Sequence, residues 1–271
     1  MNLVIIKRGI ISLLFFSFFI SFSQKDFQGV AYYESKTTID MSNFGGGQLS
    51  EERKKEIAQR MKSMYEKTYI LSFNQTESLY KEEEKLDAPG GGGGPWRVMM
   101  GSFSSGPQYK NIKEQKLLQD QEFFGKQFLI SDSLPKINWI MGSETKQIGN
   151  YMCFKATAKK TVPDPPGFGR PSNDEEEEEN KTKEIDVVAW YTLQIPINQG
   201  PDEYWGLPGL ILELNADRTT ILCSKIILNP TEKIEIKAPS KGKEVTKAEY
   251  DEIVVKKTAE MRANFRGRGG R

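Results

Sequence analysis

The sequence contains no histidine among its 271 residues. This absence excludes catalysis by Ser-His-Asp or Cys-His groups, zinc sites with histidine ligands, and a histidine-based pH switch. The 38 lysines and arginines nearly balance the 37 aspartates and glutamates. General electrostatic attraction to nucleic acid is therefore not expected, and the chain is poor in the side chains that most hydrolases use.

Cysteine is also scarce, with only Cys153 and Cys223. In an exported chain an even count favours a disulfide, and both residues lie in strand-like segments. We therefore expect a Cys153–Cys223 bridge, which would close a loop of about 70 residues and stabilise the fold by roughly 4 kcal/mol. The alternative is two separate buried thiols.

The N-terminus predicts export. Lys7 and Arg8 precede an uncharged apolar stretch at residues 9–22, and Ser21, Phe22 and Ser23 end it. This pattern is typical of a secretory signal peptide at residues 1–23, cleaved between Ser23 and Gln24. We expect a periplasmic or outer-envelope location, with an uncleaved anchor helix as the alternative. No cysteine follows the apolar stretch, so a lipoprotein is not expected.

The remaining chain is interpreted as one β-rich domain at residues 24–262 with two flexible inserts. The insert at 87–107 contains five consecutive glycines but lacks the Gly-Lys-Ser/Thr ending of a phosphate-binding loop. The insert at 162–183 contains an acidic run at 174–179. The arginine- and glycine-rich tail at 263–271 is expected to be disordered and without a partner, with weak contact to anionic lipid or polysaccharide as the alternative.

Alternating apolar residues predict strands over most of the domain. Short links between consecutive strands imply antiparallel order. We predict a mainly β (α+β) fold: one large, strongly curved antiparallel sheet, a half-barrel or partial barrel, with a two-sheet sandwich as the alternative. One inserted helix is expected at about 50–66, filling the open side of the sheet, and one C-terminal helix at about 247–262.

The segment from Trp205 to Leu212 predicts a tight turn that leads directly into a buried strand. Pro208 and Gly209 suit a type II turn in which Gly209 adopts a positive φ. Replacing Gly209 with valine should then cost more than about 1 kcal/mol, because a β-branched residue resists positive φ.

This segment resembles the signature of the GLPGLI family of exported bacterial proteins. The six signature residues are Gly206, Leu207, Pro208, Gly209, Leu210 and Ile211. The similarity extends over roughly residues 130–230, through the blocks at 148–157, 189–192, 195–197 and 200–201. The resemblance implies an envelope location and brings no established activity.

Aromatic residues beside the signature are the candidate binding site. They are Trp190, Tyr191, Tyr204 and Trp205, and the alternative is that they pack in the core. The candidate carboxylates for hydrolysis are Asp186, Asp202, Glu203 and Glu213. No catalytic residue, metal site or cofactor is predicted.

These observations favour a non-catalytic envelope protein that binds a protein partner or an apolar ligand in the concave face of its sheet. One alternative is an ion-binding protein that uses the acids at 174–179 and surface methionines such as Met99 and Met100. Another is a hydrolase built on carboxylates. No nucleic-acid partner is expected.

Overall fold

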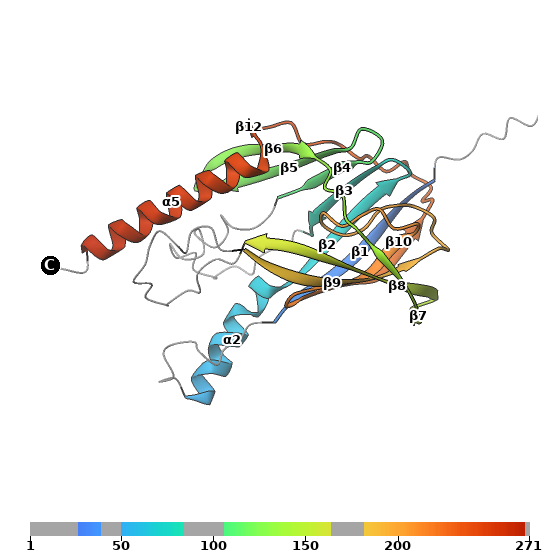
Figure 1. Ribbon diagram of the computed structural model, residues 1–271, viewed down its shortest axis with the longest axis horizontal. Coiled ribbons are helices and arrows are strands. Elements are labelled where there is room, and N and C mark those ends of the chain that lie inside the picture. Colours follow the sequence, from blue (N-terminus) through green and yellow to red (C-terminus); the bar gives the residue numbers. More distant parts are fainter. Residues whose placement is uncertain (1–26, 39–49, 84–105, 164–181, 269–271) are drawn as a thin grey trace, which may run out of the picture.

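The computed structural model describes residues 27–38, 50–83, 106–163 and 182–268 (Figure 1). The expected signal peptide at 1–23 lies outside these ranges, as does most of the expected inserts at 87–107 and 162–183. The acidic run at 174–179 and the pair Met99 and Met100 also lie outside them.

Twelve strands and two helices follow one another along the described chain. They are β1 (Gln28–Thr37), α2 (Glu51–Tyr65), β2 (Glu66–Asn74), β3 (Glu77–Glu82), β4 (Gln108–Asn111), β5 (Lys116–Phe123), β6 (Lys126–Ser133), β7 (Ile140–Ile148), β8 (Tyr151–Pro163), β9 (Thr182–Thr192), β10 (Leu210–Ala216), β11 (Thr219–Leu228), β12 (Lys243–Val245) and α5 (Lys247–Arg268).

All twelve strands belong to one sheet in the order β12-β6-β5-β4-β3-β2-β1-β11-β10-β9-β8-β7. Every pairing is antiparallel except that of β12 with β6. The sheet curves strongly but stays open, since β12 and β7 are its two edges (Figure 1). The predicted large, curved antiparallel sheet is confirmed. The short strands β4 and β12 were not predicted.

Local sequence explains the strands and their turns. In β9, Ile185, Val187, Ala189 and Tyr191 are buried and alternate with more exposed residues, as expected for a sheet with one packed face. Phe124 and Gly125 both have positive φ (48° and 74°) between β5 and β6, as a two-residue type I′ hairpin requires.

The connection between β9 and β10, residues 193–209, fills the inner side of the curved sheet (Figure 1). We call it the inner loop. Its residues Ile195, Ile197 and Leu207 are at most 2% exposed and belong to the main hydrophobic core. The inner loop also bonds to the opposite wall, because the Ser78 hydroxyl of β3 donates to Gln199 Oε1 at 2.8 Å.

The inserted helix α2 forms as predicted, and Ser50 caps it by accepting a hydrogen bond from the Arg53 backbone N–H at 3.3 Å. The expectation that this helix fills the open side of the sheet is wrong. It extends away from the ends of β1 and β2 (Figure 1), and most of its described side chains are exposed. The inner loop takes that place instead.

The predicted C-terminal helix begins at a capping box formed by Thr246 and Glu249. Glu249 Oε2 accepts from the Thr246 backbone N–H at 2.7 Å, and Thr246 Oγ1 accepts from the Glu249 backbone N–H at 3.2 Å. Tyr250 anchors the helix against Phe123 and Phe128 in a second, smaller core. The helix reaches Arg268, past the expected end near 262. Within the described ranges, no helix has both the length and the apolar character needed to cross a membrane.

The expected disulfide is absent: Cys153 and Cys223 are both free thiols. Cys153 lies in β8 and Cys223 in β11, so β9 and β10 separate them in the sheet. Three strand spacings amount to about 14 Å along the sheet, whereas a disulfide needs Cα atoms within about 7 Å. Each thiol instead donates to a nearby backbone carbonyl, of Tyr151 and Lys225 respectively. The alternative of two separate thiols is therefore the observed one.

Candidate functional site: a polar cavity on the inner side of the sheet

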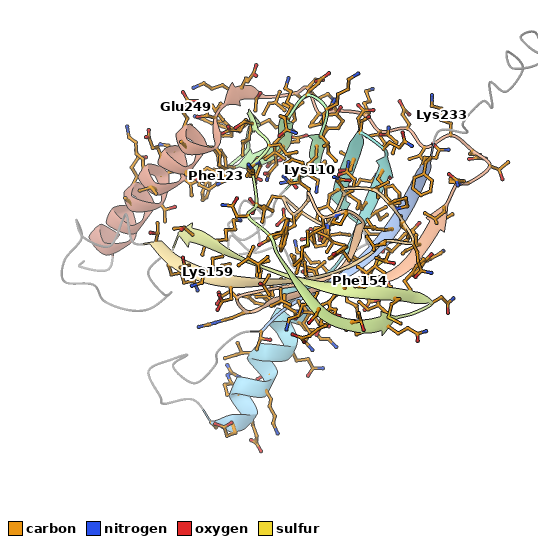
Figure 2. The ribbon with its side chains drawn as sticks, turned by 45° about the vertical axis from the view of Figure 1, so that its right-hand side comes forward. Lys110, Phe123, Phe154, Lys159, Lys233 and Glu249 are labelled. Atoms are coloured by element: carbon orange, nitrogen blue, oxygen red, sulfur yellow. The ribbon has the colours of Figure 1, made fainter. Side chains whose placement is uncertain are left out.

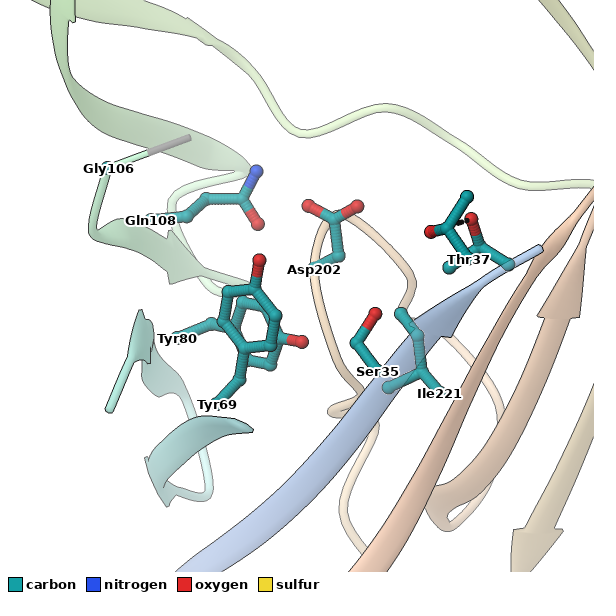
Figure 3. Close-up of a pocket in the computed structure, with 9 residues that line it drawn as sticks. Ser35, Thr37, Tyr69, Tyr80, Gly106, Gln108, Asp202 and Ile221 are labelled. Carbon is teal, nitrogen blue, oxygen red and sulfur yellow. Dashed lines mark hydrogen bonds between the residues drawn. The ribbon is translucent and has the colours of Figure 1, made fainter. Parts of the chain in front are cut away.

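A cavity of about 210 Å³ lies between the inner loop and the sheet (Figure 3). Its walls come from β1, β2, β3, β4 and β11, and the tip of the inner loop contributes Asp202. The residues that line it are Ser35, Thr37, Tyr69, Tyr80, Gly106, Gln108, Asp202, Thr219 and Ile221. Hydroxyls, an amide and a carboxylate lie in this lining beside two tyrosine rings and the Ile221 side chain, so the cavity presents both polar and apolar surface.

A tight turn places the carboxylate of Asp202 in the cavity. Asp202 has a positive φ of 52°, and the Tyr204 backbone N–H donates to the Pro201 carbonyl at 3.1 Å. Aspartate tolerates this left-handed conformation better than most residues. The side chain then points between Gln108 on one side and Ser35 on the other (Figure 3).

Two buried polar atoms of the lining have no hydrogen-bond partner within the described structure: the Tyr80 hydroxyl and Gln108 Oε1. Each residue is only 6% exposed. An unpartnered buried polar group costs about 1–3 kcal/mol, and nearly all such groups in proteins bond to something. Both residues belong to the cavity wall, so the lining carries two buried polar atoms whose hydrogen bonds are not made within the described structure.

Lys110 fixes the tip of the inner loop from β4. Its side chain is fully buried, and Nζ donates to the carbonyls of Gly200 at 2.7 Å, Tyr204 at 3.3 Å and Asp202. Three N–H donors thus meet three backbone acceptors. Figure 2 shows Lys110 in the interior, in contrast to Lys159, whose side chain is 67% exposed.

Burial and charge compete at the two ionisable groups near the loop tip. Burial lowers the pKa of Lys110 to about 7, against the attraction of the Asp202 and Glu203 carboxylates. Burial raises the pKa of Asp202 to about 6, and the Glu203 carboxylate raises it further, while Lys110 and Lys160 lower it. Asp202 therefore changes charge close to neutral pH.

Two tyrosines form an aromatic wall beside the carboxylate. The rings of Tyr69 and Tyr80 stack with centroids 4.8 Å apart and planes 12° apart. Burial raises the pKa of both phenols well above the usual range. Both hydroxyls therefore stay protonated at ordinary pH and remain able to donate and accept hydrogen bonds.

The four aromatic residues singled out from the sequence do not line this cavity. Trp190 and Tyr191 are neighbours on β9, so they face opposite sides of the sheet. Trp190 lies under Lys146, whose Nζ is 4.4 Å from the ring centroid. Tyr191 is buried and its hydroxyl donates to Met141 Sδ at 3.6 Å.

Tyr204 and Trp205 hold the inner loop in place. Tyr204 is 5% exposed and lies beneath Lys160 Nζ, 5.4 Å from the ring centroid. Trp205 Nε1 donates to the Pro135 carbonyl at 2.7 Å, and the Trp205 carbonyl accepts from Trp139 Nε1 at 2.8 Å. Binding of a partner by any of the four aromatic residues stays a prediction.

The signature segment has a different backbone from the one predicted. The glycine with positive φ is Gly206, at 91°, and not Gly209. Gly209 is required for another reason: a Cβ there would lie 2.0 Å from the Thr192 carbonyl oxygen. The predicted type II turn is therefore wrong, because close backbone contact, not a left-handed φ, requires glycine at 209. The rest of the segment is as expected, since Leu207, Leu210 and Ile211 are fully buried.

Of the candidate carboxylates, only Asp202 reaches the cavity. Glu213 pairs with Lys146 Nζ at 2.6 Å, Glu203 pairs with Lys160, and Asp186 is exposed on β9. In the part of the chain that the structure describes, no three cysteine, aspartate or glutamate side chains gather as a metal site.

The sequence reasoning missed Tyr80, Gln108 and Lys110. Tyr80 lies on the buried face of β3, and the alternation of buried and exposed residues in that strand is the one sequence signal that could have identified it. Gln108 and Lys110 belong to β4, whose four residues Gln-Tyr-Lys-Asn are all buried. No apolar pattern identifies so polar a strand as an interior one.

Comparison with curated proteins gives no match. Two solved structures of PNGF-II, in space groups C2 and P21, resemble the chain at 15% and 14% sequence identity, with TM-scores of 0.47 and 0.45. Each similarity covers 84% of this chain, which spans about a third (32%) of the PNGF-II chain.

Residues 139–213 match the model of a family described as a protein of unknown function, Porph_ging. The matched segment begins at Trp139, continues through β7, β8, β9 and the inner loop, and ends at Glu213 in β10.

Proposed function

We propose that the protein is a non-catalytic, exported binding protein that holds a small polar ligand in the cavity on the inner side of its sheet. One observation carries the proposal. Tyr80 and Gln108, each with a buried side-chain oxygen that has no partner in the described structure, line the same cavity as Asp202.

The two unpartnered oxygens support a polar ligand more than the apolar ligand expected from the sequence. The inner loop occupies the apolar part of the inner side with Ile195, Ile197 and Leu207. The space that is left has Ile221 as its one aliphatic side chain. A polar ligand satisfies the two free atoms, whereas an apolar ligand leaves them unpartnered at a cost of about 1–3 kcal/mol each.

The cavity volume limits the size of the ligand. Sites for drug-sized molecules usually measure about 300–1,000 Å³. At about 210 Å³, this cavity suits a small molecule or the end group of a larger one.

A binding role suits the charge of the site better than hydrolysis does. Most glycoside hydrolases use two carboxyl groups that flank the bond to be cleaved. Asp202 is the single carboxylate of the cavity lining, and the other candidates are paired or exposed. The ion-binding alternative depends on residues 174–179, which lie outside the described ranges.

Export and the narrower family name belong to the same proposal. The pattern of residues 1–23 supports a signal peptide. The six signature residues, from Gly206 to Ile211, lie at the end of the segment that matches the family of unknown function. Their position supports the narrower designation as a GLPGLI protein.

A pair of matched tyrosine variants tests the site. Tyr80 and Tyr109 are each 6% exposed, but the Tyr109 hydroxyl bonds to Glu77 whereas that of Tyr80 is unpartnered in the described structure. In ligand-free protein, Tyr80→Phe should leave the free energy of unfolding unchanged or raise it, whereas Tyr109→Phe should lower it by about 1–2 kcal/mol. Equal losses in urea denaturation would contradict the assignment.

Ligand detection completes the test. Saturation-transfer NMR with a set of small polar fragments should give hits that Tyr80→Phe and Asp202→Asn weaken and that Tyr109→Phe leaves unchanged. Hits that all three variants retain, or a set without hits, would contradict a ligand site in this cavity. Fractionation of cells that express the full chain tests export, and recovery in the cytoplasm would refute it.

A further inference from the structure

The charge of the cavity has no ion-pair partner in the described part of the chain. Asp202 is the only charged residue of the lining. Lys110 and Lys160 attract its carboxylate, but Lys110 Nζ donates its hydrogen bonds to three backbone carbonyls and Lys160 pairs with Glu203. The carboxylate accepts a hydrogen bond from the Glu203 backbone N–H, and no ion pair to it occurs in the described part of the chain. A half-buried carboxylate without an ion-pair partner favours a cation in the adjoining space.

The free acceptors surround one space. The Asp202 carboxylate, Gln108 Oε1 and the Tyr80 hydroxyl all belong to the lining (Figure 3). A primary ammonium group carries three N–H donors and no acceptor, and this set offers three oxygens that can accept. Lys110 shows the same chemistry nearby, because its ammonium group is held by three oxygens at the other side of the loop tip.

The tyrosine wall adds a second preference for a cation. The stacked Tyr69 and Tyr80 residues both line the cavity. A cation near a tyrosine ring gains about 0.5–2 kcal/mol, with the larger value where water is excluded. An anion would meet the Asp202 carboxylate, and a neutral ligand would leave that charge without a partner.

We infer that the ligand presents a primary ammonium group, which binds between the Asp202 carboxylate, Gln108 Oε1 and the Tyr80 hydroxyl. This inference rests on the proposed binding function and names the chemical class of its ligand. The group belongs to a small organic amine or to a lysine side chain of a polypeptide, and both present the same chemistry to the cavity.

The first test compares three four-carbon probes of matched shape. Isothermal titration of the full protein at pH 7 should detect n-butylammonium, with n-butanol and butyrate at least tenfold weaker. Equal affinity for n-butanol would overturn the ammonium inference while leaving the binding function intact. No heat from any of the three probes, together with an empty polar-fragment screen, would refute both. Potassium ion that competes with n-butylammonium at equal concentration would assign the site to an inorganic cation and overturn the inference.

The second test uses two aspartates that share a backbone conformation. Asp202 and Asp217 both have positive φ (52° and 51°), which asparagine tolerates. Asp202→Asn should weaken n-butylammonium binding at least tenfold, and Asp217→Asn, which changes an exposed pair with Lys183, should not. Equal effects of the two substitutions would overturn the inference, and circular dichroism establishes that both variants fold.

A peptide with an internal lysine, compared with n-butylammonium, distinguishes the two sources of the ammonium group. Tighter binding of the peptide points to a polypeptide partner, and tighter binding of the free amine points to a small molecule.

Discussion

Alanine at Gly209 should destabilise the protein more than alanine at Gly206, although only Gly206 has a positive φ. At Gly209 a Cβ would lie 2.0 Å from the Thr192 carbonyl oxygen and 2.6 Å from its carbon. A carbon and an oxygen need more than 3 Å, so the backbone of β9 or of the inner loop must move by about 1 Å. The buried Leu210, whose N–H donates to the Ile195 carbonyl at 3.0 Å, resists that movement. Overpacking of this kind costs about 1–3 kcal/mol, and contact with backbone puts the loss near 3 kcal/mol.

Gly206 is the matched control. A Cβ there would have no atom closer than Trp139 Nε1 at 4.0 Å, so the only penalty is the φ of 91°. That penalty is about 1–2 kcal/mol.

Urea denaturation of both variants measures the difference in the free energy of unfolding directly. Thermal denaturation gives a second measurement, because each kcal/mol shifts Tm by about 2–4 °C in a domain of this size. Gly209→Ala should melt about 6–12 °C below the parent and Gly206→Ala about 2–8 °C below it. A larger loss for Gly206→Ala, or a loss under about 1 kcal/mol for Gly209→Ala, would refute the role given to close contact with Thr192.

Three further predictions concern the lysine anchor, the thiols and the pH dependence. Lys110→Met should lower the free energy of unfolding by about 3–5 kcal/mol in urea denaturation, because it leaves three buried carbonyls without donors; a loss under about 1 kcal/mol would contradict the anchor. Alkylation of denatured, unreduced protein should label both Cys153 and Cys223 in mass spectrometry, and an unlabelled pair would show a disulfide. The affinity for n-butylammonium should be about tenfold lower at pH 5 than at pH 7, because Asp202, with a pKa near 6, must be ionised to pair with a cation; a flat profile would contradict this.

Much of the sheet follows from the sequence because its strands bury alternate residues. The periodicity of β1 and β9, and the Thr246–Glu249 cap of α5, depend only on neighbours along the chain. Such local signals survive folding, since the tertiary structure adds packing without changing the local preference.

The site could not be predicted in the same way, because its residues act through partners far away in the chain. From the sequence alone, Lys110 is expected to be an exposed lysine. Its burial depends on contacts with carbonyls of the inner loop, which lie about 90 residues later in the chain. Gly209 shows the same difficulty, because the sequence does not distinguish a glycine required by a positive φ from a glycine required by close contact with another part of the backbone. The disulfide prediction was wrong for a related reason. The strand order that separates Cys153 from Cys223 is a property of the whole sheet and cannot be deduced from either strand alone.

The anchoring of the inner loop by Lys110 has a consequence for the matched family segment. Residues 139–213 supply the loop and the strands on one side of it, but the amine that ties down its tip comes from β4, and the hydroxyl that holds Gln199 comes from β3. A fragment cut at the limits of the family match would leave the loop tip untethered. The segment that matches the family model therefore supplies the inner loop but not the side chains that hold it. Those side chains come from β3 and β4, which precede the matched segment.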